Sequence, residues 1–243
     1  MGFYQMSFQA TGFEFRNRFW FICGIFCLGF FLYLVDHRNV SVALAGLVLR
    51  GANNNPLIFA HLVTSFFAFG TLMVILAAAI RSWAESYLHS SIVHDTVLHR
   101  DKFVADGPFR HVRNPLYLGN VLFALGLGVL ASRSGFFVIF LGMLLFIYRL
   151  ILHEEANLLQ LQGDVYRQYV SVVPRLIPAL RPRIPSAGAK PNWIDGFTGE
   201  PLMWCGAAAM AVYTVTQKLS YFWIVLGLGF AIYFIQHHIR RRD

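Results

Sequence analysis

Charged residues are scarce in this sequence. They make up 13% of its 243 residues, while hydrophobic residues make up 57%. Soluble globular domains usually carry about 25% charged residues. The shortage therefore excludes an ordinary soluble domain and indicates a membrane protein. Aromatic residues, by contrast, are abundant, with 24 phenylalanines, and they suit lipid-facing helix surfaces and the aromatic belts at membrane interfaces.

Cysteine is also scarce. The three cysteines, Cys23, Cys27 and Cys205, all stand in apolar runs, where buried thiols are more common than disulfide partners. The histidines do not show the i,i+4 spacing of a helical zinc site. We therefore expect neither a disulfide framework nor a bound metal.

Apolar runs dominate the chain. They cover residues 19–35, 57–80, 116–132, 136–152, 203–217 and 221–236. This pattern predicts an all-α fold, a polytopic transmembrane helical bundle of about six spans, although several runs are short for a hydrocarbon core that needs about 20 residues. Residues 40–49 are apolar but too few to decide between a span and a surface or re-entrant piece.

The distribution of basic residues predicts the orientation. If all six runs cross the membrane, 16 of the 20 basic residues fall on one side and four on the other. Those four are Arg38, Arg50, Arg133 and Lys218. The positive-inside rule then places both termini and loops 81–115 and 153–202 in the cytoplasm, and places a bacterial chain in the inner or plasma membrane. Topology and membrane lipids explain the net charge of +8, so no nucleic-acid partner is expected.

One change of composition divides the chain. Residues 181–202, which include RPRIPSAGAKPNWIDGFTGEP, are rich in proline and glycine and are typical of a connector. This predicts a membrane core over 1–180, with its motif region at 81–178, a cytoplasmic connector over 181–202, and a C-terminal helical pair with a basic tail over 203–243.

The stretch GPFRHVRNPLYLG, residues 107–119, places polar side chains directly before an apolar run. Asn114 and Pro115 could simply begin a helix, and the arginines could simply flank a span. However, the short turn ASRSG predicts a helical hairpin whose exit, HEE at 153–155, returns to the entrance. Arg113 should therefore meet an acidic partner. Because neighbouring residues on a helix point about 100° apart, only one of Glu154 and Glu155 should face it.

This meeting of entrance and exit predicts a polar pocket at the edge of the bilayer, and ionisable groups at such a depth are candidate functional residues. The following residues, 156–178, have an amphipathic pattern that is interrupted at Gly163. They predict an interfacial helix on the cytoplasmic side that caps the pocket.

The motif, the glutamate pair and GDVYRQYVSVVPRLIP together resemble the isoprenylcysteine carboxyl methyltransferase family and its relatives, the phospholipid methyltransferases. The resemblance implies S-adenosylmethionine as the cofactor and a lipid or lipid-tethered substrate. It also implies cofactor contacts within and before the motif, and we add Glu155 as the expected partner of Arg113. The candidate cofactor-binding residues are His94, Phe103, Val104, Phe109, Arg113, Asn114, Pro115, Leu116, Tyr117 and Glu155.

The resemblance assigns the catalytic positions to Glu154 and Arg149. Glu154 is expected to orient Arg149 or to accept a proton from an amine substrate. Arg149 lies five residues before Glu154, where the family has a separation of four, and Asn114 stands where the carboxyl methyltransferases have histidine, as in the phospholipid branch. Asp101 replaces a further family histidine.

The sequence thus predicts an S-adenosylmethionine-dependent membrane methyltransferase similar to the isoprenylcysteine carboxyl O-methyltransferases. A phospholipid N-methyltransferase is the nearest alternative. An NADPH-dependent membrane lipid or sterol reductase is another, since such enzymes also carry an N-P-x-Y element. In a non-enzymatic membrane scaffold or small transporter, the same residues would form only an ion-pair cluster between helices.

Overall fold

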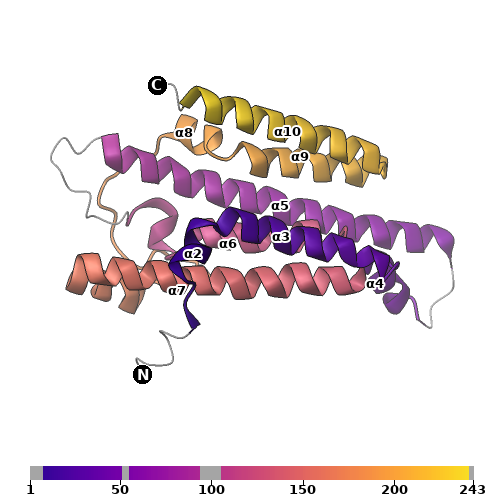
Figure 1. Ribbon diagram of the computed structural model, residues 1–243, viewed down its shortest axis with the longest axis horizontal. Coiled ribbons are helices and arrows are strands. Elements are labelled where there is room, and N and C mark those ends of the chain that lie inside the picture. The colour runs from indigo at the N-terminus through magenta and orange to yellow at the C-terminus, as the bar shows by residue number, and fades with distance from the viewer. Residues whose placement is uncertain (1–7, 51–54, 94–104, 241–243) are drawn as a thin grey trace. The chain divides into compact units, whose positions relative to one another are not determined.

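The computed structural model describes residues 8–50, 55–93 and 105–240, with the side chains of 89–93 and 236–240 excepted. Its elements within these ranges are helices, as the ribbons of Figure 1 show, and the all-α prediction is confirmed there. The α-helices are α2 Gly12–Arg16, α3 Arg18–Phe31, α4 Val40–Val48, α5 Pro56–Val93, α6 Pro115–Gly128, α7 Arg133–Val172, α8 Trp193–Thr198, α9 Pro201–Thr216 and α10 Leu219–Arg240. The 3₁₀-helices are η1 Leu32–Leu34 and η2 Gly107–Arg110.

Each of the six predicted apolar runs lies largely within helical structure, although the bounds differ. Within the described residues, α5 and α7 are long and apolar enough to cross a membrane by themselves, and α3 with η1, α6, α9 and α10 are shorter apolar helices. Helix α4 has nine residues, so it is about 14 Å long and too short to span a bilayer.

Helix α5 extends beyond the apolar run that ends at residue 80. Helix α5 continues through Val93 because RSWAESYL contains neither proline nor glycine to end it. Helix α7 likewise runs past the predicted end of its apolar run to Val172, with a kink at Gly163, whose φ of 56° and ψ of −124° are not helical. This kink confirms the predicted interruption there. Glycine adopts a positive φ without the steric cost that other residues carry.

The chain divides into two compact units. Unit 1 consists of Met1–Phe21, Ala79–Asn120 and Leu144–Glu200, and unit 2 of Ile22–Ala78, Val121–Met143 and Pro201–Asp243. The divisions fall inside α3, α5, α6 and α7. Unit 1 therefore contains the motif stretch, the glutamate pair and the connector as far as Glu200.

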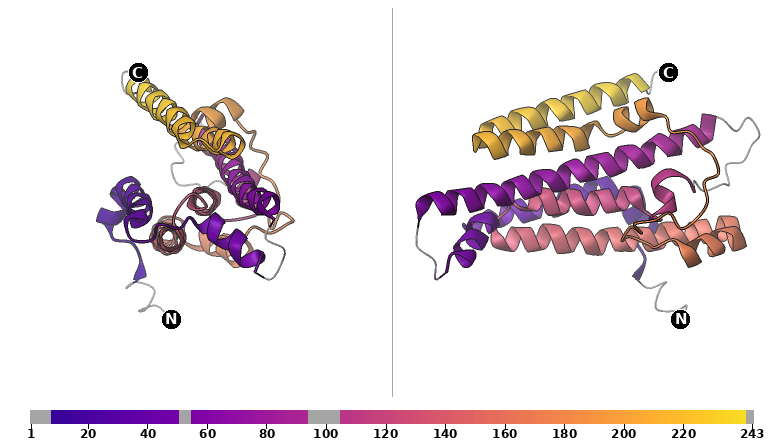
Figure 2. Two further views of the ribbon diagram at one scale, coloured as in Figure 1. Left: turned by 90° about the vertical axis from the view of Figure 1, so that its right-hand side faces the viewer. Right: turned by 180° about the vertical axis from the view of Figure 1, so that it is seen from behind.

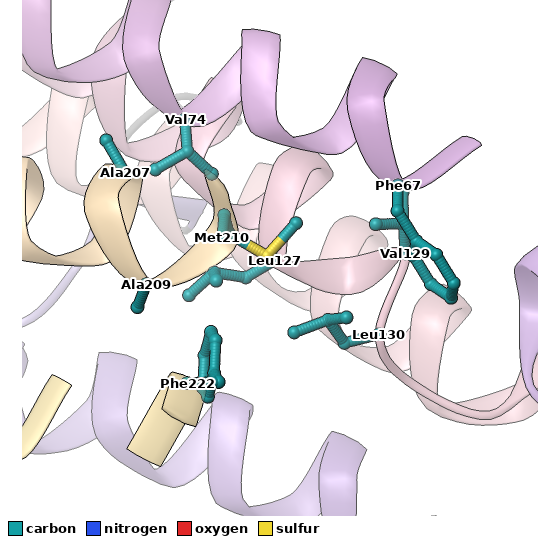
Figure 3. Close-up of a cluster of buried hydrophobic side chains, with 9 residues drawn as sticks. All are labelled: Phe67, Val74, Leu127, Val129, Leu130, Ala207, Ala209, Met210 and Phe222. Carbon is teal, nitrogen blue, oxygen red and sulfur yellow. The ribbon is translucent and has the colours of Figure 1, made fainter. Parts of the chain in front are cut away.

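Unit 2 has an apolar core of its own. Helices α9 and α10 lie side by side and antiparallel in both figures of the whole chain (Figures 1 and 2), joined by a turn at Gln217. Their side chains meet those of α5 and of the α6–α7 hairpin (Figure 3). The buried members are Phe67, Val74, Leu127, Val129, Leu130, Ala207, Ala209, Met210 and Phe222.

The α6–α7 turn of unit 2 is fixed by polar contacts. The Asn39 amide donates to the carbonyl oxygens of Val129 and Ala131, at 3.1 Å each. The Asp36 carboxylate pairs with Arg133 at 2.9 Å. These bonds satisfy backbone groups that a helix end leaves without partners, so the hairpin reverses tightly, as its short turn predicts.

Candidate active site

The motif stretch begins with a sharp turn. Gly107 has φ of 56°, and a side chain there would collide with the ring of Tyr87. The chain then forms η2, and Pro115 opens α6 as its first residue, a position where a missing N–H costs nothing. This local geometry places Arg113 and Asn114 immediately before α6, in the same unit as the exit of α7.

Glu155 is the centre of the polar network of unit 1. Only 8% of this residue is exposed. Its Oε1 accepts hydrogen bonds from Arg113 Nη1 at 2.9 Å and Asn114 Nδ2 at 3.1 Å. Its Oε2 pairs with Arg175 Nη2 at 2.9 Å. The predicted meeting of motif and hairpin exit is therefore confirmed, and Glu155 is the glutamate that faces Arg113.

The same two motif residues hold the segment that follows α7. Arg113 donates through Nε to the Val173 carbonyl at 2.8 Å and through its backbone N–H to the Pro174 carbonyl at 2.9 Å. Asn114 donates to the Arg175 carbonyl at 3.1 Å. Burial by itself would lower the pKa of Arg175, but the hydrogen bond and charge of Glu155 outweigh it and raise that pKa. The Arg175 guanidinium therefore remains a charged partner of the Glu155 carboxylate.

The helix after the Gly163 kink caps the motif, as its amphipathic pattern predicts. Tyr166, Tyr169 and Val173 form a buried cluster. The Tyr169 hydroxyl donates to the Phe109 carbonyl at 2.8 Å. Burial raises the pKa of Tyr166 and of Tyr169 far above the usual tyrosine value, so both hydroxyls stay protonated and able to donate.

Glu154 has different surroundings. It is half-buried and accepts a hydrogen bond from the Tyr117 hydroxyl. The positive charges of Arg18 and Arg81 also interact electrostatically with this hydroxyl. The two adjacent glutamates thus divide their partners: Glu155 binds the residues before α6, and Glu154 binds the first turn of α6.

Arg149 does not have the partner that the sequence suggested. Its guanidinium forms two bonds to the Glu14 carboxylate, at 2.7 and 2.9 Å. Thr11 and Glu14 form a capping box at the start of α2, and the Thr11 N–H is the main cause that lowers the pKa of Glu14. The expectation that Glu154 orients Arg149 is therefore corrected: Arg149 fastens the N-terminal segment to α7.

The connector also packs on the motif. Asp106, which is 2% exposed, accepts hydrogen bonds from the Ser186 hydroxyl at 2.7 Å and from the N–H groups of Ala187 and Ala189 at 3.1 and 2.9 Å. Burial would raise the pKa of Asp106, but these hydrogen bonds prevail and lower it. Arg183 N–H donates to the Arg110 carbonyl at 2.8 Å, so residues 183–189 lie along the motif stretch.

Sequence reasoning missed several contributors to this unit, among them Glu14, Arg81, Asp106, Arg175 and Glu200. The T-x-x-E pattern at 11–14 could have identified the start of α2, but nothing in it points to Arg149. Of the predicted cofactor residues, His94, Phe103 and Val104 lie outside the described part of the chain. Among described residues, no group of three or more His, Cys, Asp or Glu side chains could hold a metal ion.

Comparison with known proteins supports the resemblance that the sequence motifs suggest. Residues 60–164 match the family described as phospholipid methyltransferase. This part of the chain is therefore similar to that family. The similarity and the long apolar helices α5 and α7 together indicate an integral membrane protein. Protein-S-isoprenylcysteine O-methyltransferase of Schizosaccharomyces pombe is 34% identical over 105 residues, which are 42% of this chain and 44% of that protein. The chain thus spans less than half the length of this relative, and no solved structure is significantly similar to it.

The segment shared with the phospholipid methyltransferase family supplies only part of the network. Arg113, Asn114, Tyr117 and both glutamates lie within 60–164. Arg175, which follows that segment, completes the contacts of Glu155 and Asn114. Glu14, Tyr169 and Glu200, also outside the segment, bind Arg149, Phe109 and Arg81 within it.

Proposed function

We propose that this protein is a methyltransferase that uses S-adenosylmethionine to methylate a lipidic or lipid-tethered acceptor. The observation that carries the proposal is the division of the glutamate pair. Glu155 is held by Arg113, Asn114 and Arg175, while Glu154 stays half-buried beside the Tyr117 hydroxyl. In this arrangement Glu155 fixes the side chains around it, and Glu154 is the carboxylate that can take part in the reaction.

The donor set suits the cofactor. S-adenosylmethionine carries an ammonium, a carboxylate and a cationic sulfonium. At the start of α6, unit 1 offers the Glu154 carboxylate for a cationic group, together with the Tyr117 hydroxyl and the guanidinium groups that Glu155 holds. Asn114, Pro115, Leu116 and Tyr117 would hold the cofactor, which supplies an already electrophilic methyl group. Positioning then provides most of the catalysis.

The chain's own residues have two tasks in this scheme. Glu155 does not contact the reacting atoms, because its oxygens are occupied by protein donors; it fixes Arg113 and Asn114. Glu154 faces the reacting centre and accepts a proton where the acceptor is an amine.

Two acceptor classes are compatible with the family: a carboxylate, as in the isoprenylcysteine O-methyltransferases, and a phospholipid amine. The pairing of Arg149 with Glu14 favours the amine, because it neutralises the arginine that would attract a carboxylate. Parallel assays with a prenylated cysteine and with phosphatidylethanolamine, each with a labelled methyl donor, would decide. Transfer to the prenylated cysteine alone would contradict the preference for an amine.

The first test separates the proposal from the other functions. S-adenosylhomocysteine should raise the melting temperature of the detergent-purified full chain, since a ligand that binds only the folded state stabilises it. NADPH should not. Stabilisation by NADPH alone would indicate a reductase, and stabilisation by neither would leave the ion-pair network as a structural feature of a non-enzymatic membrane protein.

A second prediction concerns cofactor affinity. Asn114→Ala and Tyr117→Ala should each weaken binding of S-adenosylhomocysteine by about tenfold, the effect of losing one charge-assisted hydrogen bond. Isothermal titration calorimetry on the full chain would measure this loss. Ser171→Ala is the control, since Ser171 is exposed and its hydroxyl donates to the Gln168 carbonyl three residues earlier on the same helix. Wild-type affinity in both site variants would rule out this cofactor site.

A third prediction concerns orientation. We propose that unit 1 faces the cytoplasm, as the distribution of basic residues indicates. In a chain without its three native cysteines, Lys190→Cys should resist labelling by an impermeant thiol reagent in intact cells, and His37→Cys should be labelled. Both positions are exposed, so the difference would report the side of the membrane. The reverse pattern would invert the topology.

A further inference from the structure

Arg81 connects three parts of unit 1. Its Nε and Nη2 bind the two oxygens of Glu200 at 2.9 and 2.7 Å. Its Nη1 donates to the Leu116 carbonyl at 3.1 Å and to Asn120 Oδ1 at 2.9 Å. One guanidinium group thus joins the end of the connector to the first turns of α6. A planar fork of donors is suited to such a role, and a lysine could not replace it.

Glu200 is held in place by more than this ion pair. It is 6% exposed, and the short helix α8 before it lies directly against α5. A Cβ atom on Gly196 would come within 2.5 Å of the Ser82 carbonyl oxygen, and the Asn192 N–H donates to the Ser86 carbonyl at 2.8 Å. Close backbone contact of this kind fixes where the carboxylate stands.

The α6 turn that Arg81 contacts is the one that carries the candidate site. Leu116 is adjacent to Tyr117, and the Arg81 charge also acts on the Tyr117 hydroxyl. Glu200 lies beyond the segment shared with the phospholipid methyltransferase family, whereas Arg81 and α6 lie within it. Two carboxylates therefore support the site: Glu155, through Arg113 and Asn114, and Glu200, through Arg81.

We propose that Glu200 is a positioning residue for the cofactor site, acting through Arg81 on the first turn of α6. This role rests on the proposed function. In this role Glu200 fixes the guanidinium group of the half-buried Arg81, and the Arg81 Nη1 donor then holds the Leu116 carbonyl and Asn120. Loss of either link loosens the turn that carries Tyr117.

Asn120→Ala gives the sharpest test, because it removes one link to α6 and leaves the Arg81–Glu200 ion pair intact. We expect an unchanged melting temperature, faster hydrogen–deuterium exchange over residues 116–120, and a several-fold higher KM for the methyl donor at nearly unchanged kcat. Glu200→Gln should show the same changes more strongly, with about tenfold weaker S-adenosylhomocysteine binding and a lower melting temperature.

Asp36→Asn serves as the control, since it breaks a different arginine ion pair, with Arg133 at 2.9 Å, and should leave donor binding unchanged. The inference is wrong if Asn120→Ala has the hydrogen–deuterium exchange rate and the donor KM of the wild type and Glu200→Gln changes only the melting temperature. The Arg81–Glu200 ion pair would then be merely structural. If the wild-type chain binds no S-adenosylhomocysteine, the proposed function fails and this role fails with it. Binding to the wild type with equal affinity in the variants refutes the positioning role alone.

Discussion

Glu155→Gln should destabilise the fold by about 3 kcal/mol, the lower end of the cost of leaving a buried charge without its partner. Glu155 balances two guanidinium groups, and the side chains of Arg113 and Glu155 are only 10% and 9% exposed. A glutamine can still accept one hydrogen bond, but its NH₂ group must then face the other arginine, donor against donor. Chemical denaturation of the detergent-purified chain would measure the loss.

The matched control is Asp164→Asn. Its partner Arg167 lies three residues along the same helix at 2.8 Å, and the two side chains are 84% and 71% exposed. Exposed pairs of this kind contribute about 0–1 kcal/mol, so the variant should be close to the wild type. Equal stability of Glu155→Gln and Asp164→Asn would show that the network around Glu155 is dispensable.

Loss of Glu155 should also weaken S-adenosylhomocysteine binding, because Arg113 and Asn114 lose the carboxylate that fixes them. Asn114 would keep its bond to the Arg175 carbonyl, so the site should loosen without disappearing. Calorimetry at a temperature where the variant remains folded separates this effect from unfolding.

Glu154→Gln should have the opposite profile: normal stability, normal donor affinity and a turnover reduced by about ten- to a hundred-fold, which corresponds to about 1.5–3 kcal/mol of transition-state stabilisation. Glu154 is half-buried and has the Tyr117 hydroxyl as a donor, so its amide analogue keeps the shape and loses only the charge. Steady-state kinetics with a lipid acceptor would separate kcat from the KM of the donor.

Tyr117→Phe is the informative companion. It removes the hydroxyl that binds Glu154 and keeps the ring. If Glu154 acts only through that hydrogen bond, the two variants should have equal turnover; if Glu154 accepts a proton, Glu154→Gln should be the slower. Near-wild-type turnover in Glu154→Gln would show that this carboxylate has no catalytic role.

The sequence alone predicted the apolar helices, because a run of apolar residues must form a helix to satisfy its backbone in a membrane. It also predicted the contact of Arg113 with the glutamate pair, since a five-residue turn between two helices makes them antiparallel and brings the hairpin's exit back to its entrance. The kink at Gly163 and the capping helix followed from an amphipathic pattern with one glycine in it.

Tertiary structure decided the remaining partners. Arg149 pairs with Glu14 across 135 residues, and Arg81 with Glu200 across 119. Any of several arginines on the same side could satisfy either carboxylate, and nothing local distinguishes them. The choice depends on where the N-terminal segment and the connector come to lie, which is set by contacts such as Gly196 against the Ser82 carbonyl. Periodicity and charge counting detect which residues need partners, whereas only the folded chain determines which partners they have.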